Sequence, residues 1–95
     1  PEIRVDCPDN LKFQAIEKLS AAIGSGTGEF KIKDIIRIDG LRVNFEGGWA
    51  LVRASNTQPV LVMRFEAADE ALISKAKAFM KDCMKRACPE IEAVF

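Results

Sequence analysis

The sequence contains no histidine, and its acidic and basic residues balance. Fourteen lysines and arginines oppose fourteen aspartates and glutamates, so the formal net charge is zero. Without histidine there is no Ser-His-Asp or Cys-His machinery and no histidine metal ligand. A neutral chain also lacks the broad positive field on which non-specific binding to DNA or RNA depends. Histidine-based catalysis is therefore excluded, and general nucleic-acid binding is disfavoured.

Cysteine and long apolar runs are scarce as well. The three cysteines, Cys7, Cys83 and Cys88, are an odd number and too few to hold a structural zinc ion alone. A secreted domain of this size would carry an even and denser set, so we expect reduced thiols and a cytoplasmic location. No apolar run approaches the roughly 18 residues of a membrane helix, so we expect no membrane contact.

The chain is long enough for one globular domain, with 95 residues of which 48% are apolar. It begins at Pro1 rather than at methionine, and we therefore expect a piece of a longer protein. Ile3 and Val5 alternate with charged residues, which is typical of a short strand half covered by a core.

The next stretch changes to a helical period. Apolar side chains recur at steps of three and four residues, at Phe13, Ile16, Leu19 and Ile23. This stripe predicts an amphipathic helix from Asp9 to Ile23, with Asp9 or Asn10 as its N-cap and Gly24 as its end. The glycines from Gly24 to Gly28 do not match a dinucleotide or Walker fingerprint, so we interpret them as a flexible connector.

The middle of the chain has the period of two that strands show. The expected strands are Ile35–Ile38, Leu41–Phe45, Trp49–Ser55 and Val60–Ala67. Tight turns are expected at Asp39-Gly40 and Gly47-Gly48. Phe45, Phe65 and Trp49 occupy positions that we assign to the core. These segments predict an antiparallel sheet of about four strands, whose edge the strand around Ile3 could join.

The last element is a second amphipathic helix, from Asp69 to Ala87. Asp69 is a good N-cap, and Pro89 prevents the helix from continuing. The apolar face consists of Leu72, Ala76, Phe79, Cys83 and Ala87. Cys83 and Cys88 are thus packing and helix-end residues rather than a redox pair. The predicted fold class is α+β, with an antiparallel sheet and two helices on one face.

One segment has the composition of a ligand site. Arg53-Ala54-Ser55-Asn56-Thr57-Gln58-Pro59 joins two expected strands and is rich in hydrogen-bond donors. A guanidinium fork matches phosphate oxygens in pairs, and hydroxyl and amide groups add neutral donors. We also expect the backbone N–H groups from Ala54 to Thr57 to leave the sheet and be free for an anion. A polar turn with a solvated arginine remains the alternative.

These residues also carry a resemblance to a known family. Asp39-Gly40-Leu41-Arg42-Val43, the run from Gly48 through Arg53-Ala54-Ser55-Asn56-Thr57 to Pro59, and Val60 to Ala67 resemble the alpha-D-phosphohexomutases. The similarity is to the C-terminal domain of the bacterial phosphomannomutase/phosphoglucomutase members, and it spans essentially the whole chain. It implies a fold like that of the TATA-box-binding protein, with strand–helix–three strands–helix order, where the number of strands depends on how the hairpin is counted.

The resemblance also implies a function. Family members are cytoplasmic four-domain isomerases that interconvert hexose 1-phosphates and 6-phosphates through a phosphoserine, magnesium and a hexose 1,6-bisphosphate. Their last domain grips the phosphate that is not being transferred and closes the cleft. By position, Arg53, Ser55, Asn56 and Thr57 would contact that phosphate, with Ala54 contributing backbone. Arg64 could contact the phosphate as well, and a salt bridge on the surface or face of the sheet is an equal alternative for this residue.

The 95 residues contain no serine-nucleophile segment, no aspartate-rich metal loop and no sugar-selecting loop of the family. We therefore expect no catalytic residue, metal or cofactor in this domain, and no mutase activity without the other domains of the enzyme. The sugar preference stays open. An alternative hypothesis for the function is a nucleic-acid-binding α+β module, because RNA-recognition domains share this architecture. A purely structural or dimerising domain would leave the donor-rich segment at Arg53 unexplained.

Overall fold

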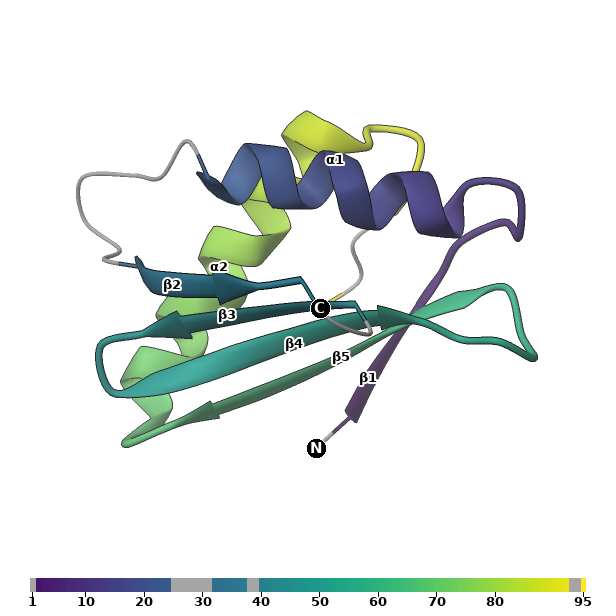
Figure 1. The fold of residues 1–95 in the computed structure, drawn as a ribbon. Helices are drawn as coiled ribbons and strands as arrows, with labels where there is room; N and C mark the ends of the chain where they lie inside the picture. The colour runs from purple at the N-terminus through teal and green to yellow at the C-terminus, as the bar shows by residue number, and fades with distance from the viewer. Residues whose placement is uncertain (1, 25–31, 38–39, 93–94) are drawn as a thin grey trace.

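The protein is an antiparallel sheet covered on one face by two helices (Figure 1). The computed structural model describes residues 2–24, 32–37, 40–92 and 95. In chain order the elements are β1 (Glu2–Asp6), α1 (Lys12–Gly24), β2 (Ile32–Ile36), β3 (Leu41–Phe45), β4 (Gly48–Ala54), β5 (Val60–Ala67) and α2 (Glu70–Ala87). The predicted α+β class is confirmed.

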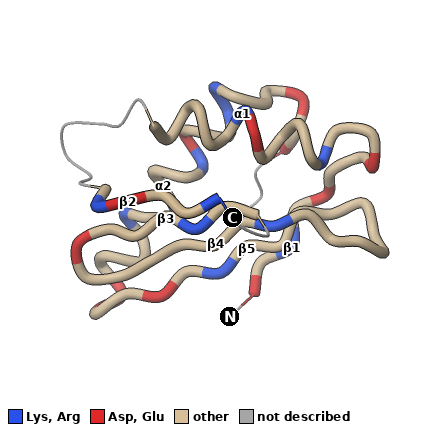
Figure 2. The backbone as a smooth tube through the Cα atoms, viewed as in Figure 1, with Lys and Arg blue, Asp and Glu red and all other residues tan. Residues whose placement is uncertain are grey.

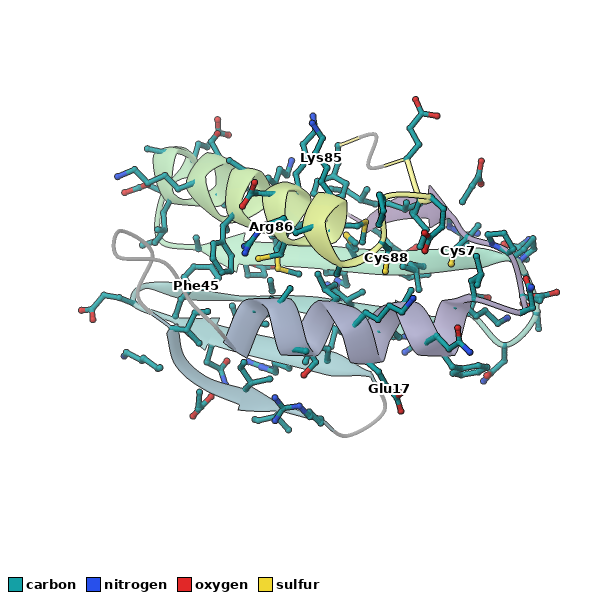
Figure 3. All side chains as sticks on the ribbon, turned by 90° about the horizontal axis from the view of Figure 1, so that it is seen from above. Cys7, Glu17, Phe45, Lys85, Arg86 and Cys88 are labelled. Carbon is teal, nitrogen blue, oxygen red and sulfur yellow. The ribbon has the colours of Figure 1, made fainter. Side chains whose placement is uncertain are left out.

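The sheet has five strands in the order β1-β5-β4-β3-β2, and every neighbouring pair is antiparallel. The fifth strand is β1, which pairs with β5 at the edge, so the edge position expected for the strand around Ile3 is confirmed and brings the expected four strands to five. The resulting order is strand–helix–four strands–helix rather than the three-strand form. Because β1 and β2 lie at opposite edges, α1 crosses the sheet between them. Seen from above, α1 and α2 lie side by side over the same face (Figure 3).

The core lies between the sheet and the helices. Along β3, β4 and β5 alternate side chains are buried there, namely Leu41, Val43, Phe45, Ala50, Val52, Leu61, Met63 and Phe65, and β1 adds Val5. Trp49 was expected among these core residues, but its side chain points to the opposite face of the sheet from Ala50 and Val52 and is only partly buried. Its ring lies on the open face, where the Arg42 guanidinium sits 4.6 Å from the ring centroid. The expectation was wrong because the small Ala50 takes the core position.

Helix α2 follows the sequence expectation closely. The Asp69 carboxylate accepts a hydrogen bond from the Leu72 N–H at 2.8 Å, which satisfies one of the free donors of the first turn. At the other end, the Cys88 N–H donates to the Met84 carbonyl at 2.7 Å. The apolar face is buried at Ala76, Phe79 and Cys83 and also includes Met80 and Met84.

Helix α1 is rotated relative to its expected stripe. It begins at Lys12, three residues later than predicted, after a turn in which the Leu11 and Lys12 N–H groups donate to the Pro8 carbonyl. Phe13, expected in the core, is 62% exposed. Leu19 and Ile23 of the expected stripe are buried and Ile16 is partly buried, but the buried face also includes Lys12, Ala15 and Ser20. The prediction failed at the first turn because Lys12, not Phe13, faces the neighbouring loop.

The three cysteines are buried free thiols. Burial raises the pKa of Cys7, Cys83 and Cys88, and at Cys83 it outweighs the nearby Arg86 guanidinium, which acts to lower that pKa. The packing role expected for Cys83 and Cys88 is confirmed. Within the described ranges, neither helix combines the length and the apolar character needed to cross a membrane.

The tight turn expected at Gly47-Gly48 lies one residue earlier, at Glu46-Gly47, because Gly48 already pairs with Phe45 as the first residue of β4. Gly47 has a φ of +88°, a conformation that favours glycine, and it leads into β4. Gly40 has a φ of +112°, and a Cβ there would meet the Val52 carbonyl oxygen at 2.6 Å. The expected glycine connector beyond Gly24 and the residues Ile38 and Asp39 lie outside the described residues.

Candidate functional site

The donor-rich segment forms the connection between β4 and β5, here called the β4–β5 loop (residues 55–59). The Ser55 N–H donates to the Val60 carbonyl at 3.1 Å and closes the base of the loop. On the other side, the Cys7 N–H donates to the Pro59 carbonyl at 2.8 Å. The loop therefore lies against the turn between β1 and α1, although about 50 residues separate them in the chain.

Ser55 organises the tip of the loop. Its Oγ accepts hydrogen bonds from the N–H groups of Thr57 at 3.3 Å and Gln58 at 3.2 Å, which is the geometry of a serine turn. The expectation of free N–H groups from Ala54 to Thr57 is therefore only partly met, since those of Ser55 and Thr57 are engaged. The Asn56 N–H has no acceptor in the described part of the chain.

A pocket of about 400 Å³ opens beside this loop on the uncovered face of the sheet. It is lined by Glu2, Arg4, Leu51, Arg53, Ser55, Asn56, Thr57, Val62 and Arg64. Arg53 reaches it because side chains alternate along β4, with Val52 directed into the core. Four of the five residues that the sequence assigned to phosphate binding thus meet in one place.

The pocket carries an excess of positive charge. Arg4, Arg53 and Arg64 line it against a single carboxylate, Glu2. Positively charged segments of β1, β4 and β5 accordingly lie close together in the backbone view (Figure 2). Arg4 is engaged, because it donates to the Gln58 Oε1 at 2.8 Å and lies 3.7 Å from the Glu2 carboxylate. The Arg53 and Arg64 guanidinium groups have no hydrogen-bond or ion-pair partner among the described residues.

The fifth assigned residue, Ala54, lines a different hollow. A second pocket, of about 310 Å³, lies between the loop and α1 and is lined by Phe13, Ile16, Gly40, Arg53, Ala54 and Asn56. Arg53 and Asn56 border both pockets, so these two residues divide one from the other. The hydroxyl donors lie only on the open side, which makes the open-face pocket the better site for an anion.

Two residues near the loop were missed by sequence reasoning. In the sequence, Arg4 indicates only the polar half of a strand pattern, and Lys12 falls outside the apolar stripe of its helix. Lys12 is buried, and its ammonium group contacts the Ser55 carbonyl, the Gln58 carbonyl at 3.3 Å and the Asp9 carboxylate at 2.9 Å. A lysine near a helix start normally indicates a solvated side chain, so no sequence signal marks this one.

The arrangement is suited to holding an anion rather than to transforming one. The guanidinium of Arg53 can donate two parallel hydrogen bonds to oxygens of a phosphate, and the Asn56 and Thr57 side chains add neutral donors. No group of three or more cysteine, aspartate or glutamate residues that could hold a metal ion occurs in the described ranges. The described residues therefore provide no ligand set of this kind for the magnesium ion that the family resemblance implies.

Comparisons with known proteins identify the family of this chain. The model of the phosphoglucomutase/phosphomannomutase C-terminal domain matches residues 2–82. A phosphomannomutase/phosphoglucomutase of Pseudomonas putida is 40% identical over 95 residues, which cover 100% of this chain and 19% of that protein. A phosphoglucomutase of Neisseria gonorrhoeae is 46% identical over 77 residues, covering 79% of this chain and 16% of that protein.

A solved structure shares the fold as well. The crystal structure of a phosphoglucomutase/phosphomannomutase family protein from Burkholderia thailandensis superposes with a TM-score of 0.76 at 32% identity, over 97% of this chain and 18% of that one. The chain belongs to the phosphoglucomutase/phosphomannomutase family and corresponds to its C-terminal domain. It spans about a fifth of the length of the relatives that it matches.

Proposed function

We propose that this domain binds the phosphate of a hexose phosphate that is not being transferred, within a full-length phosphohexomutase. The observation that carries the proposal is the gathering of Arg53, Ser55, Asn56 and Thr57 around one pocket, with the Arg53 guanidinium unpaired in the described structure. The names of the relatives, phosphomannomutase and phosphoglucomutase, supply the substrate class. The chain's own geometry supplies the phosphate-binding chemistry.

The residues of the pocket would donate two kinds of hydrogen bond to the phosphate, charged ones from arginine and neutral ones from hydroxyl groups. Arg53 donates a charge-assisted pair of hydrogen bonds to two phosphate oxygens. The Ser55 hydroxyl, whose oxygen already accepts two N–H groups, is left to donate its hydrogen outward, as is the Thr57 hydroxyl. Arg64 adds a second unpaired positive charge on the adjacent strand, so we assign it to the pocket rather than to a salt bridge. Binding a phosphate dianion needs these donors and no general base.

The remaining steps are assigned to the rest of the enzyme. The phosphoserine, the hexose 1,6-bisphosphate intermediate and the magnesium ion, which neutralises phosphoryl charge when bound, belong to the domains outside this chain. The domain itself would act as a lid that closes over the sugar and opens for release, inside a cytoplasmic enzyme. The chain alone is accordingly expected to lack mutase activity. No observation favours a nucleic-acid module, because Trp49 is the one aromatic on the open face of the described strands and Arg42 covers it.

The test is Arg53→Ala in the full-length enzyme, assayed with glucose 1-phosphate and mannose 1-phosphate. Loss of one bidentate charged contact is expected to lower kcat/KM by about tenfold to a hundredfold. Arg53→Lys should recover only part, because an ammonium keeps the charge but not the fork. Arg86→Ala, which removes an exposed arginine from the helix layer, is the matched control and should leave kcat/KM unchanged.

Thermal melting of the same proteins separates binding from folding. Arg53 is exposed and unpaired in the described structure, so its removal should leave the melting temperature close to that of the wild type. Near-normal kcat/KM for Arg53→Ala at low substrate would show that the β4–β5 loop does not hold the phosphate.

A further inference from the structure

Lys12 is the unusual charged residue of this domain. It is only 5% exposed, whereas lysine is almost never fully buried without partners. Its ammonium group is surrounded by oxygen atoms, namely the carbonyls of Ser55 and Gln58 and the carboxylate of Asp9. Asp9 is 72% exposed on its side-chain surface, so the pair is open to water on one side only. The inner side of the ammonium faces the β4–β5 loop.

The contact with Ser55 sets the direction of one peptide group. In a trans peptide, the carbonyl of one residue and the N–H of the next point in opposite directions. The Ser55 carbonyl points to Lys12 on α1, so the Asn56 N–H points away from α1. That N–H is the one in residues 55–58 without an acceptor in the described part of the chain.

The two carbonyls depend on Lys12 to different degrees. The Gln58 carbonyl also accepts the Val60 N–H at 2.8 Å, so it would keep a partner if the ammonium were removed. The Ser55 carbonyl has no second donor among the described residues, so removal of the ammonium would free this peptide to rotate. A cation on its carbonyl end also polarises the peptide, which makes the Asn56 N–H a better donor.

We propose that Lys12 is a positioning residue for phosphate binding, which holds the Ser55–Asn56 peptide so that the Asn56 N–H donates to a phosphate oxygen. Lys12 does not itself touch the ligand. This inference rests on the proposed function of the β4–β5 loop, and it selects the Asn56 N–H from the backbone donors that the sequence indicated between Ala54 and Thr57. It also explains why a costly buried charge lies directly under an exposed loop.

The test uses Lys12→Met in the full-length enzyme, because methionine keeps the length and apolar packing of the lysine stem but removes every donor. With glucose 1-phosphate as substrate, KM is expected to rise about tenfold, the usual scale for one lost hydrogen bond to a charged group. Lys12→Gln, whose amide can still donate to the Ser55 carbonyl, should recover part of this loss. Lys18→Met removes an exposed lysine from the same helix and should behave as the wild type.

Hydrogen exchange of the peptide that contains Asn56 supplies a readout that a merely structural role would not change. In the wild type and in Lys18→Met, glucose 1-phosphate should slow exchange of this peptide. In Lys12→Met, the same protection should require about ten times more substrate, in line with the change in KM. If Lys12→Met does not fold, the comparison is made with Lys12→Gln, for which a smaller shift in the same direction is expected.

The outcomes separate this inference from the function on which it rests. A normal KM and normal protection in the folded Lys12 variants, combined with a large loss in Arg53→Ala, would overturn the role of Lys12 alone. Normal kinetics in Arg53→Ala would overturn the proposed function itself. A lower melting temperature without any change in KM would show that Lys12 only stabilises the fold, and would also overturn the inference.

Discussion

Strands β4 and β5 present two sides with opposite chemistry, one apolar and covered by the helices and the other charged and open. Toward the helices, Val52, Leu61 and Met63 are completely buried. Toward the open face, the residues next to them in sequence, Arg53 and Arg64, are exposed and without partners in the described structure. The side of the sheet to which a residue points therefore decides whether a substitution there should affect folding or the proposed phosphate binding.

The largest effect is expected on the covered side, with Leu61→Ala. Truncating a fully buried leucine should lower the free energy of unfolding by about 2–5 kcal/mol, since it removes apolar contacts and leaves a cavity. Val62→Ala, one position further on the open side, should cost less than about 1 kcal/mol. Urea denaturation followed by circular dichroism measures both. Equal losses would contradict the division of the two strands into a folding side and a binding side.

The side of each strand was readable from the sequence where apolar residues alternate without interruption. In β3 the alternation of Leu41, Val43 and Phe45 with polar residues predicted both the strand bounds and the buried face. In α2 the capping aspartate and the proline after the helix fixed both ends. These signals are local, so a single sequence contains them.

The errors occurred where a distant segment decided the outcome. Phe13 is more apolar than Lys12, so the stripe placed Phe13 in the core, yet Lys12 is buried because carbonyls of residues 55–59 supply its partners. Those carbonyls lie more than 40 positions away in the chain, and no helical pattern encodes them. Trp49 was misplaced for a similar reason, because the core opposite β4 accommodates a small side chain at Ala50. The sequence thus predicted the loop residues of the candidate site. It did not predict Lys12 and Arg4, which contact the loop from α1 and β1.

A second, intermediate effect concerns the buried thiols of the covered side. Burial raises the pKa of Cys83 in the folded protein above its value in the unfolded chain. The associated stability is fully present below the unfolded thiol pKa and is lost as pH rises through the folded pKa. From about pH 8.5 upward, each such thiol should lower the free energy of unfolding by up to about 1.4 kcal/mol per pH unit.

Cys83→Ala tests this contribution through the slope rather than through the absolute stability. Urea unfolding between pH 8 and 10 is expected to show a shallower decline for Cys83→Ala than for the wild type. Glu66→Gln, which changes an exposed carboxylate on the open side of β5, should leave the slope unaltered. An identical slope in all three proteins would mean that the Cys83 thiol titrates alike in the folded and unfolded states.

The smallest effect is expected on the open side, with Arg42→Ala. The Arg42 guanidinium lies over the Trp49 ring, and its Nε donates to the Asn44 Oδ1 at 3.1 Å. An exposed cation–π contact of this kind contributes about 0.5–1 kcal/mol, so the loss in unfolding free energy should stay within that range. Trp49 is the single tryptophan of the chain, and its emission should shift to longer wavelength as water replaces the guanidinium. Arg42→Lys should restore part of both signals, because lysine keeps the charge without the planar stack.

Unchanged emission would show that Arg42 does not cover the ring in solution. A loss as large as that of Leu61→Ala would instead mean that the open side stabilises the fold as strongly as the core, and the contrast between the two sides would fail.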